Sequence, residues 1–249
     1  MRSENPASLA CKHAALLAPE VVRAIRKIRG FAAVVDADAI RGGIEACVSE
    51  HPLRPGTRRQ AVVHEAGHLI GFEFEDLIAG GACVNGPPFG RGGWGGEAWR
   101  YRERCIEHGP WANDPLAFIR EATGRLAGPI AEEVLGDGHA LTSIRELIEA
   151  KLLTARAAEL SGRDGGFFWH AALLRTAAIV ERHANEIEEI AEMLMHRKRV
   201  NRDQPSMRRI LERVRPALVA LAGLSTRSTE LVRLIETAVP SFDALLEAS

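Results

Sequence analysis

Apolar residues recur along this chain every three to four positions over most of its length. This spacing places them on one face of a helix and predicts amphipathic α-helices. The apolar stretch at residues 31–40 is expected to end where Gly42 and Gly43 interrupt it. The helices predicted from this pattern lie near residues 21–28, 58–72, 115–135, 144–152, 168–196, 210–221 and 229–239.

Residues 80–96 interrupt the helical pattern with eight glycines and two prolines. Within this segment Ala82–Asn85 and Trp94–Tyr101 could form short strands, but glycine at this density favours turns and close backbone approach over a regular sheet. The sequence therefore predicts a mainly α fold, with a small glycine-rich β element next to the helix at residues 58–72.

Turn residues divide the chain. The run His-Pro-Leu-Arg-Pro-Gly at residues 51–56 has the composition of a turn and marks a boundary. It separates an N-terminal helical segment, residues 1–56, from a main domain at residues 57–204. We expect residues 205–249 to form a C-terminal helical extension packed on the same domain. A chain of 249 residues is long enough to bury a sizeable core.

Composition narrows the functional classes. Lys and Arg number 32 against 33 Asp and Glu, so the near-neutral chain is not built to coat nucleic acid or an anionic membrane. No apolar run approaches the roughly 18 residues of a membrane span, and the first residues lack the apolar core of a signal peptide. Four isolated cysteines form no C-x-x-C pair. This fits a reducing compartment, and we expect a cytoplasmic protein.

The strongest chemical signal is the motif His64-Glu65-Ala66-Gly67-His68. Histidines at positions i and i+4 lie one turn apart on the same helical face, so both imidazoles can reach one Zn²⁺ ion. The helix start is also clear, because Thr57 and Gln60 have the form of a capping box. Glu65 lies beside the first ligand, where it can act as the general base for a zinc-activated water.

Four stretches of the chain resemble the peptidase domain of the FtsH-type AAA+ zinc metalloproteases. They are AVVHEAGHLIGF, GPPFGRGGWGGEAW, GRLAGPIAEEVLG and AAIVERHANEIEEIAEMLMHRKRV, which occur in the family's order. The resemblance covers about residues 57 to 205. It implies a mostly helical zinc endopeptidase domain with His64 and His68 as ligands and Glu65 as catalytic base. It also implies that substrate adds as an extended strand beside the glycine-rich segment, at Gly92, Gly93, Trp94 and Gly95.

The third metal ligand departs from the family pattern. The family has an Asp in a Gly-Ala-x-x-Asp stretch, where this chain reads DGHALTSIRELIEAKL with no matching Asp. Counting from Glu133 places Glu146 near the ligand position, and a glutamate could reach the metal with one more methylene. Glu149, Asp137 and His139 are the alternatives. Glu132 or Glu133 could supply a carboxylate that orients a zinc-bound imidazole.

The family also joins its peptidase to an ATPase and a membrane anchor, but this sequence contains no G-x-x-x-x-G-K-[ST] loop. The sequence therefore predicts an ATP-independent zinc metallopeptidase that cleaves unfolded or flexible polypeptides. A separate ATPase or a homo-oligomer is the expected partner. The alternative is a binding or regulatory module that kept the peptidase fold without turnover.

Overall fold

The computed structural model describes residues 6–26, 36–51, 56–86, 93–101, 113–214 and 224–240. Within these ranges it contains nine α-helices, one short 3-10 helix and three strands, which confirms the mainly α fold predicted from the sequence. None of the described helices is long and apolar enough to cross a membrane.

Helix α3 (Arg58–Phe74) carries the His-Glu-x-x-His motif. The N–H of Gln60 donates to the Thr57 hydroxyl oxygen at 3.1 Å, and the N–H of Thr57 donates to the Gln60 side-chain oxygen at 2.7 Å. These two bonds form the capping box that the sequence predicts. Nearly all residues from Ala61 to Phe72 are buried, so this helix presents almost no face to solvent.

Helix α4 (Pro115–Leu135) packs along α3 and leads through the short 3-10 helix η3 (Ala140–Ser143) into α5 (Ile144–Ser161). The contact between α3 and α4 depends on small residues. A methyl group added to Gly67 would lie 2.5 Å from the carbonyl oxygen of Ala127, and one added to Gly71 would lie 2.6 Å from the Ala127 side chain. The two backbones therefore approach to a distance that only glycine permits at these positions.

The three strands form one antiparallel sheet in the order β2-β1-β3, from β1 (Ala79–Asn85), β2 (Gly95–Arg100) and β3 (Arg199–Asn201). The described ends of the glycine-rich segment, residues 80–85 and 95–96, thus lie in paired strands, where its composition favours turns. Trp99 explains the glycines of β1, because methyl groups at Gly80 and Gly81 would lie 2.6 and 2.5 Å from its indole ring. These glycines allow a large ring to lie against the strand.

The N-terminal segment forms α1 (Pro6–Arg26) and α2 (Ala37–Glu50). Helix α2 begins at Asp36, whose carboxylate accepts the N–H groups of Asp38 and Ala39. Gly42 and Gly43 lie inside α2, so the prediction that they end this element is wrong. A methyl group on Gly43 would lie 2.3 Å from the ring of Pro240, and close packing therefore accounts for that glycine.

The helix predicted at residues 168–196 is in fact two helices, α6 (Gly165–Arg182) and α7 (Ala184–Arg197). The chain leaves helical geometry at His183, which is buried and has φ −108° and ψ 26°. The break lets α6 pack on α4 and α5 while α7 packs on α3. Apolar periodicity continues across such a break, which is why the sequence pattern does not reveal it.

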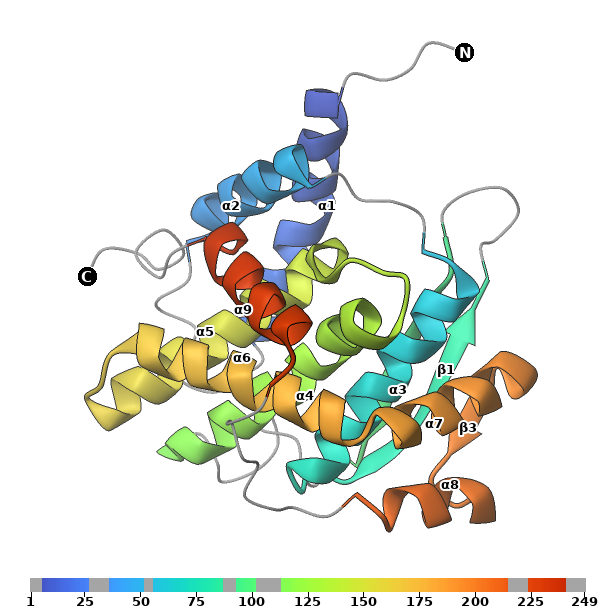
Figure 1. The fold of residues 1–249 in the computed structure, drawn as a ribbon. Helices are drawn as coiled ribbons and strands as arrows, with labels where there is room; N and C mark the ends of the chain where they lie inside the picture. The colour runs from blue at the N-terminus through green and yellow to red at the C-terminus, as the bar shows by residue number, and fades with distance from the viewer. Residues whose placement is uncertain are drawn as a thin grey trace, which may run out of the picture.

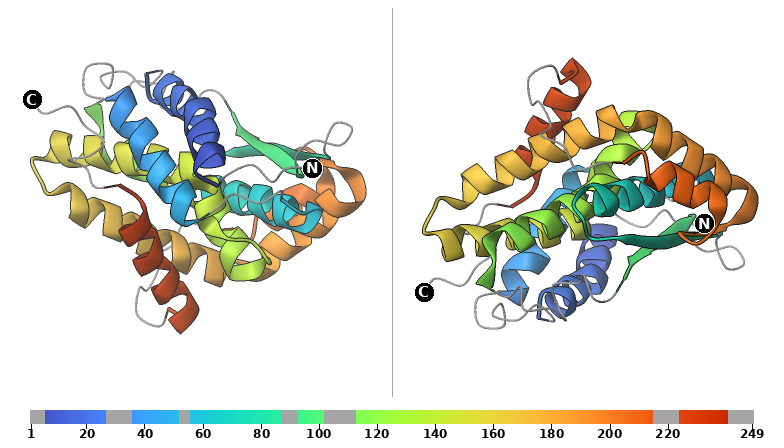
Figure 2. Two further views of the ribbon diagram at one scale, coloured as in Figure 1. Left: turned by 90° about the horizontal axis from the view of Figure 1, so that it is seen from above. Right: turned by 90° about the horizontal axis from the view of Figure 1, so that it is seen from below.

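Helices α8 (Pro205–Leu211) and α9 (Thr226–Ala238) are the last two helices of the described residues. The second agrees with the helix predicted at residues 229–239, whereas the predicted helix at 210–221 largely falls on residues 215–223, outside the described ranges. One hydrophobic cluster includes Ile25, Leu126 and Ile235, and so joins the N-terminal, central and C-terminal parts of the chain. The sheet lies at one end of the molecule and the turn between α5 and α6 at the other (Figure 1, Figure 2).

Candidate metal centre

His64 and His68 on α3 and Glu146 in the first turn of α5 bring three potential ligand atoms together. The two Nε2 atoms lie 3.0 Å apart, and Glu146 Oε2 lies 3.1 Å from that of His64 and 3.4 Å from that of His68. Ligands bound at about 2.0–2.2 Å in a tetrahedral zinc site lie roughly 3.3–3.6 Å apart. Within the described ranges this is the one group of three such side chains with metal-ligand spacing.

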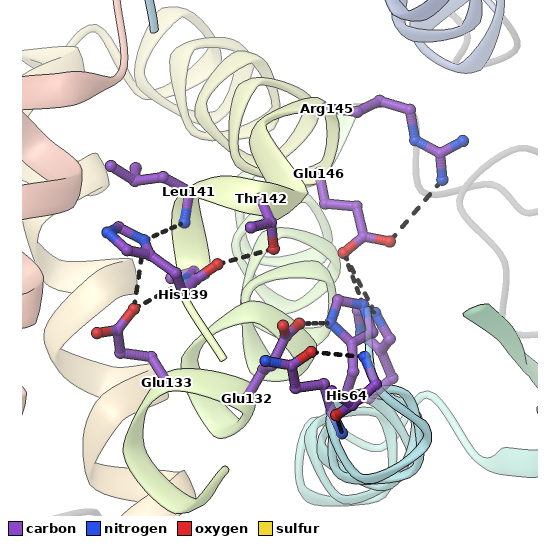
Figure 3. A network of polar contacts seen from close by, with 12 residues as sticks. His64, Glu132, Glu133, His139, Leu141, Thr142, Arg145 and Glu146 are labelled. Atoms are coloured by element: carbon purple, nitrogen blue, oxygen red, sulfur yellow. Dashed lines mark hydrogen bonds and ion pairs between the residues drawn. The ribbon is translucent and has the colours of Figure 1, made fainter. Parts of the chain in front are cut away.

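The other ring nitrogens fix which atoms face the centre. His64 Nδ1 lies 3.0 Å from a carboxylate oxygen of Glu132, and His68 Nδ1 lies 2.8 Å from the carbonyl oxygen of Gly124 (Figure 3 shows the first contact). Both oxygens accept, so we assign the proton of each neutral ring to Nδ1 and a lone pair to Nε2. Two nitrogen lone pairs and a carboxylate oxygen therefore converge, which is the donor set of a divalent cation.

The charges at the centre favour a cation. Burial lowers the pKa of His64, but the Glu146 carboxylate and the hydrogen bond to Glu132 outweigh burial and raise that pKa well above its ordinary value. Burial raises the pKa of Glu146, but the charges of His64 and His68 outweigh it and lower that pKa well below its ordinary value. Glu146 Oε2 is buried and accepts no hydrogen bond from any described residue. A positive charge at this point, a proton or a metal ion, is therefore strongly stabilised.

Helix α4 positions both imidazoles. A methyl group on Gly128 would lie 2.4 Å from His68 Nε2, so this glycine makes room for the ring. A methyl group on Gly138 would lie 2.4 Å from a carboxylate oxygen of Glu132, so a second glycine makes room for the group that orients His64. The stretch GRLAGPIAEEVLG thus supplies the carbonyl of Gly124, the space at Gly128 and the carboxylate of Glu132. The sequence alone indicates no role for the glycines of this stretch.

The two neighbouring glutamates of α4 have different surroundings. Glu132 contacts His64, whereas Glu133 accepts the N–H of Ala140 at 2.6 Å and lies 3.5 Å from His139 Nδ1 (Figure 3). Of the two carboxylates considered from the sequence, Glu132 is therefore the one placed to orient a ligand.

The alternative third ligands lie outside the cluster. Glu149 is buried in ion pairs with Arg125 and Arg145. His139 caps η3, where its Nδ1 accepts the N–H of Leu141 at 3.3 Å. Asp137 follows the end of α4, and its backbone carbonyl accepts the side-chain amide of Gln60. Of the four candidates, the structure brings only Glu146 to the histidines.

Glu65 is buried between the motif helix and strand β2. A methyl group on Gly96 of β2 would lie 2.7 Å from a carboxylate oxygen of Glu65, so the strand backbone passes directly beside this side chain. Burial raises the pKa of Glu65; His64 and His68 oppose the shift, and Glu146 and Glu97 add to it. A raised pKa makes a carboxylate a stronger base, as general base catalysis near neutral pH requires.

The residues predicted to bind substrate lie at the start of β2. Gly92 is outside the described residues, Gly93 and Trp94 precede the strand, and Gly95 is its first residue. The Trp94 N–H donates to the Gly56 carbonyl at 2.8 Å, and its ring faces the guanidinium of Arg58 at 4.9 Å. Trp94 therefore makes contacts within the protein through both its backbone and its ring. A role of Trp94 in binding substrate remains a prediction. Among the described glycines, the one whose added methyl group would meet Glu65 is Gly96, which the sequence did not single out for binding.

Neither the family models nor the curated proteins compared with this chain give a match. The resemblance to the FtsH-type peptidases therefore rests on the four sequence stretches. The structure independently adds a His-His-Glu group that could hold a metal ion.

Proposed function

We propose that the protein is an ATP-independent zinc metalloendopeptidase that hydrolyses peptide bonds in unfolded or flexible polypeptides. The observation that carries the proposal is the convergence of His64, His68 and Glu146 beside the buried carboxylate of Glu65. Structural zinc sites have four protein ligands, whereas catalytic sites have three and keep one position open. The described cluster has three.

Different side chains would bind the metal ion, orient the imidazoles and transfer the proton. His64, His68 and Glu146 would hold the ion, and Glu132 and the Gly124 carbonyl would keep both rings in the required tautomer. A bound zinc ion lowers the pKa of water toward about 7 and polarises a carbonyl group. Glu65 would take the proton of the attacking water and deliver it to the leaving amine.

Strand β2 offers a place for an extended substrate. It is an edge strand of the described sheet, because β1 pairs with it on one side and no described strand pairs on the other. A peptide can bind such an edge through its main chain, which makes binding largely independent of side-chain sequence. Since Gly96 lies against Glu65, a peptide along β2 would pass close to the general base.

The test is the substitution Glu65→Gln, assayed on a reduced, unfolded protein with zinc present. Glutamine has nearly the same shape but cannot accept the proton, so we expect kcat to fall by about 10²- to 10⁴-fold while the bound zinc and the melting temperature remain. Glu192→Gln is the matched control, because Glu192 is exposed on α7, and we expect wild-type turnover.

Unchanged turnover in Glu65→Gln would contradict the proposed mechanism. Wild-type protein that holds zinc but cleaves no unfolded substrate would instead support the module without turnover. Metal content and cleavage are therefore measured on the same preparations.

A further inference from the structure

Arg145 lies next to the candidate ligand Glu146 in the first turn of α5 and faces three carboxylates. Its guanidinium lies 2.9 Å from Glu20, 3.6 Å from Glu149 and 3.8 Å from Oε1 of Glu146. Figure 3 shows it on the side of Glu146 away from the histidines. The two oxygens of Glu146 are thus divided, with Oε2 toward the imidazoles and Oε1 toward Arg145.

This division matters because a glutamate ligand is flexible. Its carboxylate sits on three rotatable side-chain bonds, and fixing them costs conformational entropy. When a cation contacts the carboxylate oxygen that faces away from the metal, the side chain loses part of its rotational freedom before the metal binds. Partners of this kind orient metal ligands and commonly change metal affinity by about 10- to 100-fold.

Arg145 is itself anchored by a chain of ion pairs. Its partner Glu149 is buried and also pairs with Arg125 of α4. Arg125 lies 3.3 Å from Glu121, which in turn accepts a hydrogen bond from Arg100 at 2.8 Å. The chain runs from the last residue of β2 through α4 to the first turns of α5. It fixes Glu149, and thereby the guanidinium that faces Glu146.

We propose that Arg145 is a positioning residue that holds Glu146 in the orientation needed for the third metal ligand. The inference rests on the metal centre of the proposed function but not on peptide cleavage. Arg145 acts through Oε1 of Glu146, so its contribution requires the Glu146 carboxylate.

The test measures Zn²⁺ affinity by competition with a chromophoric chelator, and the visible spectrum of the Co²⁺-substituted protein. We expect Arg145→Ala to weaken Zn²⁺ binding by about 10-fold or more and to change the Co²⁺ ligand-field bands, with Arg145→Lys partly restoring both. In the Glu146→Gln variant only the two imidazoles remain to bind Zn²⁺, and their affinity is measured by direct titration with Zn²⁺. In this variant we expect Arg145→Ala to cause no further loss of Zn²⁺ affinity.

Arg213→Ala is the matched control. Arg213 is as exposed as Arg145, at 41% against 40%, and it also pairs with two carboxylates, those of Glu186 and Glu189. We expect this variant to bind Zn²⁺ like the wild type. Melting temperatures of the metal-free variants separate a loss of fold from a loss of ligand orientation.

Three results would overturn the inference. One is Zn²⁺ affinity and a Co²⁺ spectrum unchanged in Arg145→Ala, and another is an equal loss with and without the Glu146 carboxylate. Failure of the wild type to bind either ion would overturn both the inference and the proposed function. Metal binding that depends on Arg145 without any peptide cleavage would overturn the proposed function alone.

Discussion

Two groups of charged side chains meet at the first two turns of α5, through Glu146 and Glu149, and they are neutralised differently. In the ion-pair chain, Glu121 is 2.5 Å from the guanidinium of Arg100 and 3.3 Å from that of Arg125. Burial raises the pKa of Glu121, but the two arginines outweigh it and lower that pKa below its ordinary value. Every charge in this chain has its counter-charge within the protein.

At the metal centre Oε2 of Glu146 faces two imidazoles, and an arginine, Arg145, lies 3.8 Å from the other oxygen only. In the assigned tautomers each neutral imidazole uses its Nδ1 proton elsewhere, so neither ring donates to Glu146. A buried carboxylate oxygen that accepts no hydrogen bond, such as Glu146 Oε2, costs free energy until a cation binds to it. The comparison shows that glutamates on adjacent helices can stabilise the fold or prepare a site for an external cation, depending on what faces them.

The largest expected effect is the loss of stability when a substitution breaks the ion-pair chain. Glu121→Gln leaves the partly buried guanidinium groups of Arg100 and Arg125 against a neutral amide, and we expect the free energy of unfolding to fall by about 3–5 kcal/mol in urea titrations. Glu20→Gln, which removes a half-exposed partner of Arg145, should cost no more than about 1 kcal/mol. A loss for Glu121→Gln as small as that of Glu20→Gln would contradict this account of the chain.

A smaller effect is expected on Zn²⁺ affinity when the glutamate that contacts His64 is changed. Glu132→Gln keeps the shape of the side chain but removes the charge that orients and polarises His64, and we expect Zn²⁺ affinity to fall by about 10- to 100-fold. Glu133→Gln changes the adjacent residue, which contacts Ala140 and His139 instead. Calorimetric titration of the two variants should separate them, and equal affinities would remove the orienting role assigned to Glu132.

The smallest expected effect is in the pH dependence. The pKa of His64 is raised above the 6.5 of an unperturbed histidine, so a protonated His64 stabilises the metal-free fold. That contribution is fully present below pH 6.5 and is lost as pH rises through the raised pKa. A metal ion competes with the proton, so zinc stabilisation should instead grow with pH.

Melting temperatures from pH 6 to 9, with chelator and with zinc, should therefore change in opposite directions. The variant His64→Ala is the control and should lose both trends. Parallel curves for the wild type in the two conditions would contradict the assigned charges.

The sequence was informative where a local pattern sufficed. The capping box of Thr57 and Gln60 and the i, i+4 histidines both depend on residues within one or two helical turns, and both appear as predicted. It failed at Gly42 and Gly43, where propensity suggested a break but packing against Pro240 accounts for Gly43. It also missed β3, because three residues that pair with a distant strand carry no periodic signal.

The sequence by itself determined the helical class, the position of the motif helix and the placing of two histidines on one face of it. Each follows from local spacing, which an α-helix converts directly into a shared face. Only the tertiary structure decided which carboxylate joins the histidines, which glutamate orients His64 and that Arg145 faces Glu146. Those relations depend on how α3, α4 and α5 pack, and such packing distances are set by side-chain volumes at contacts remote in sequence.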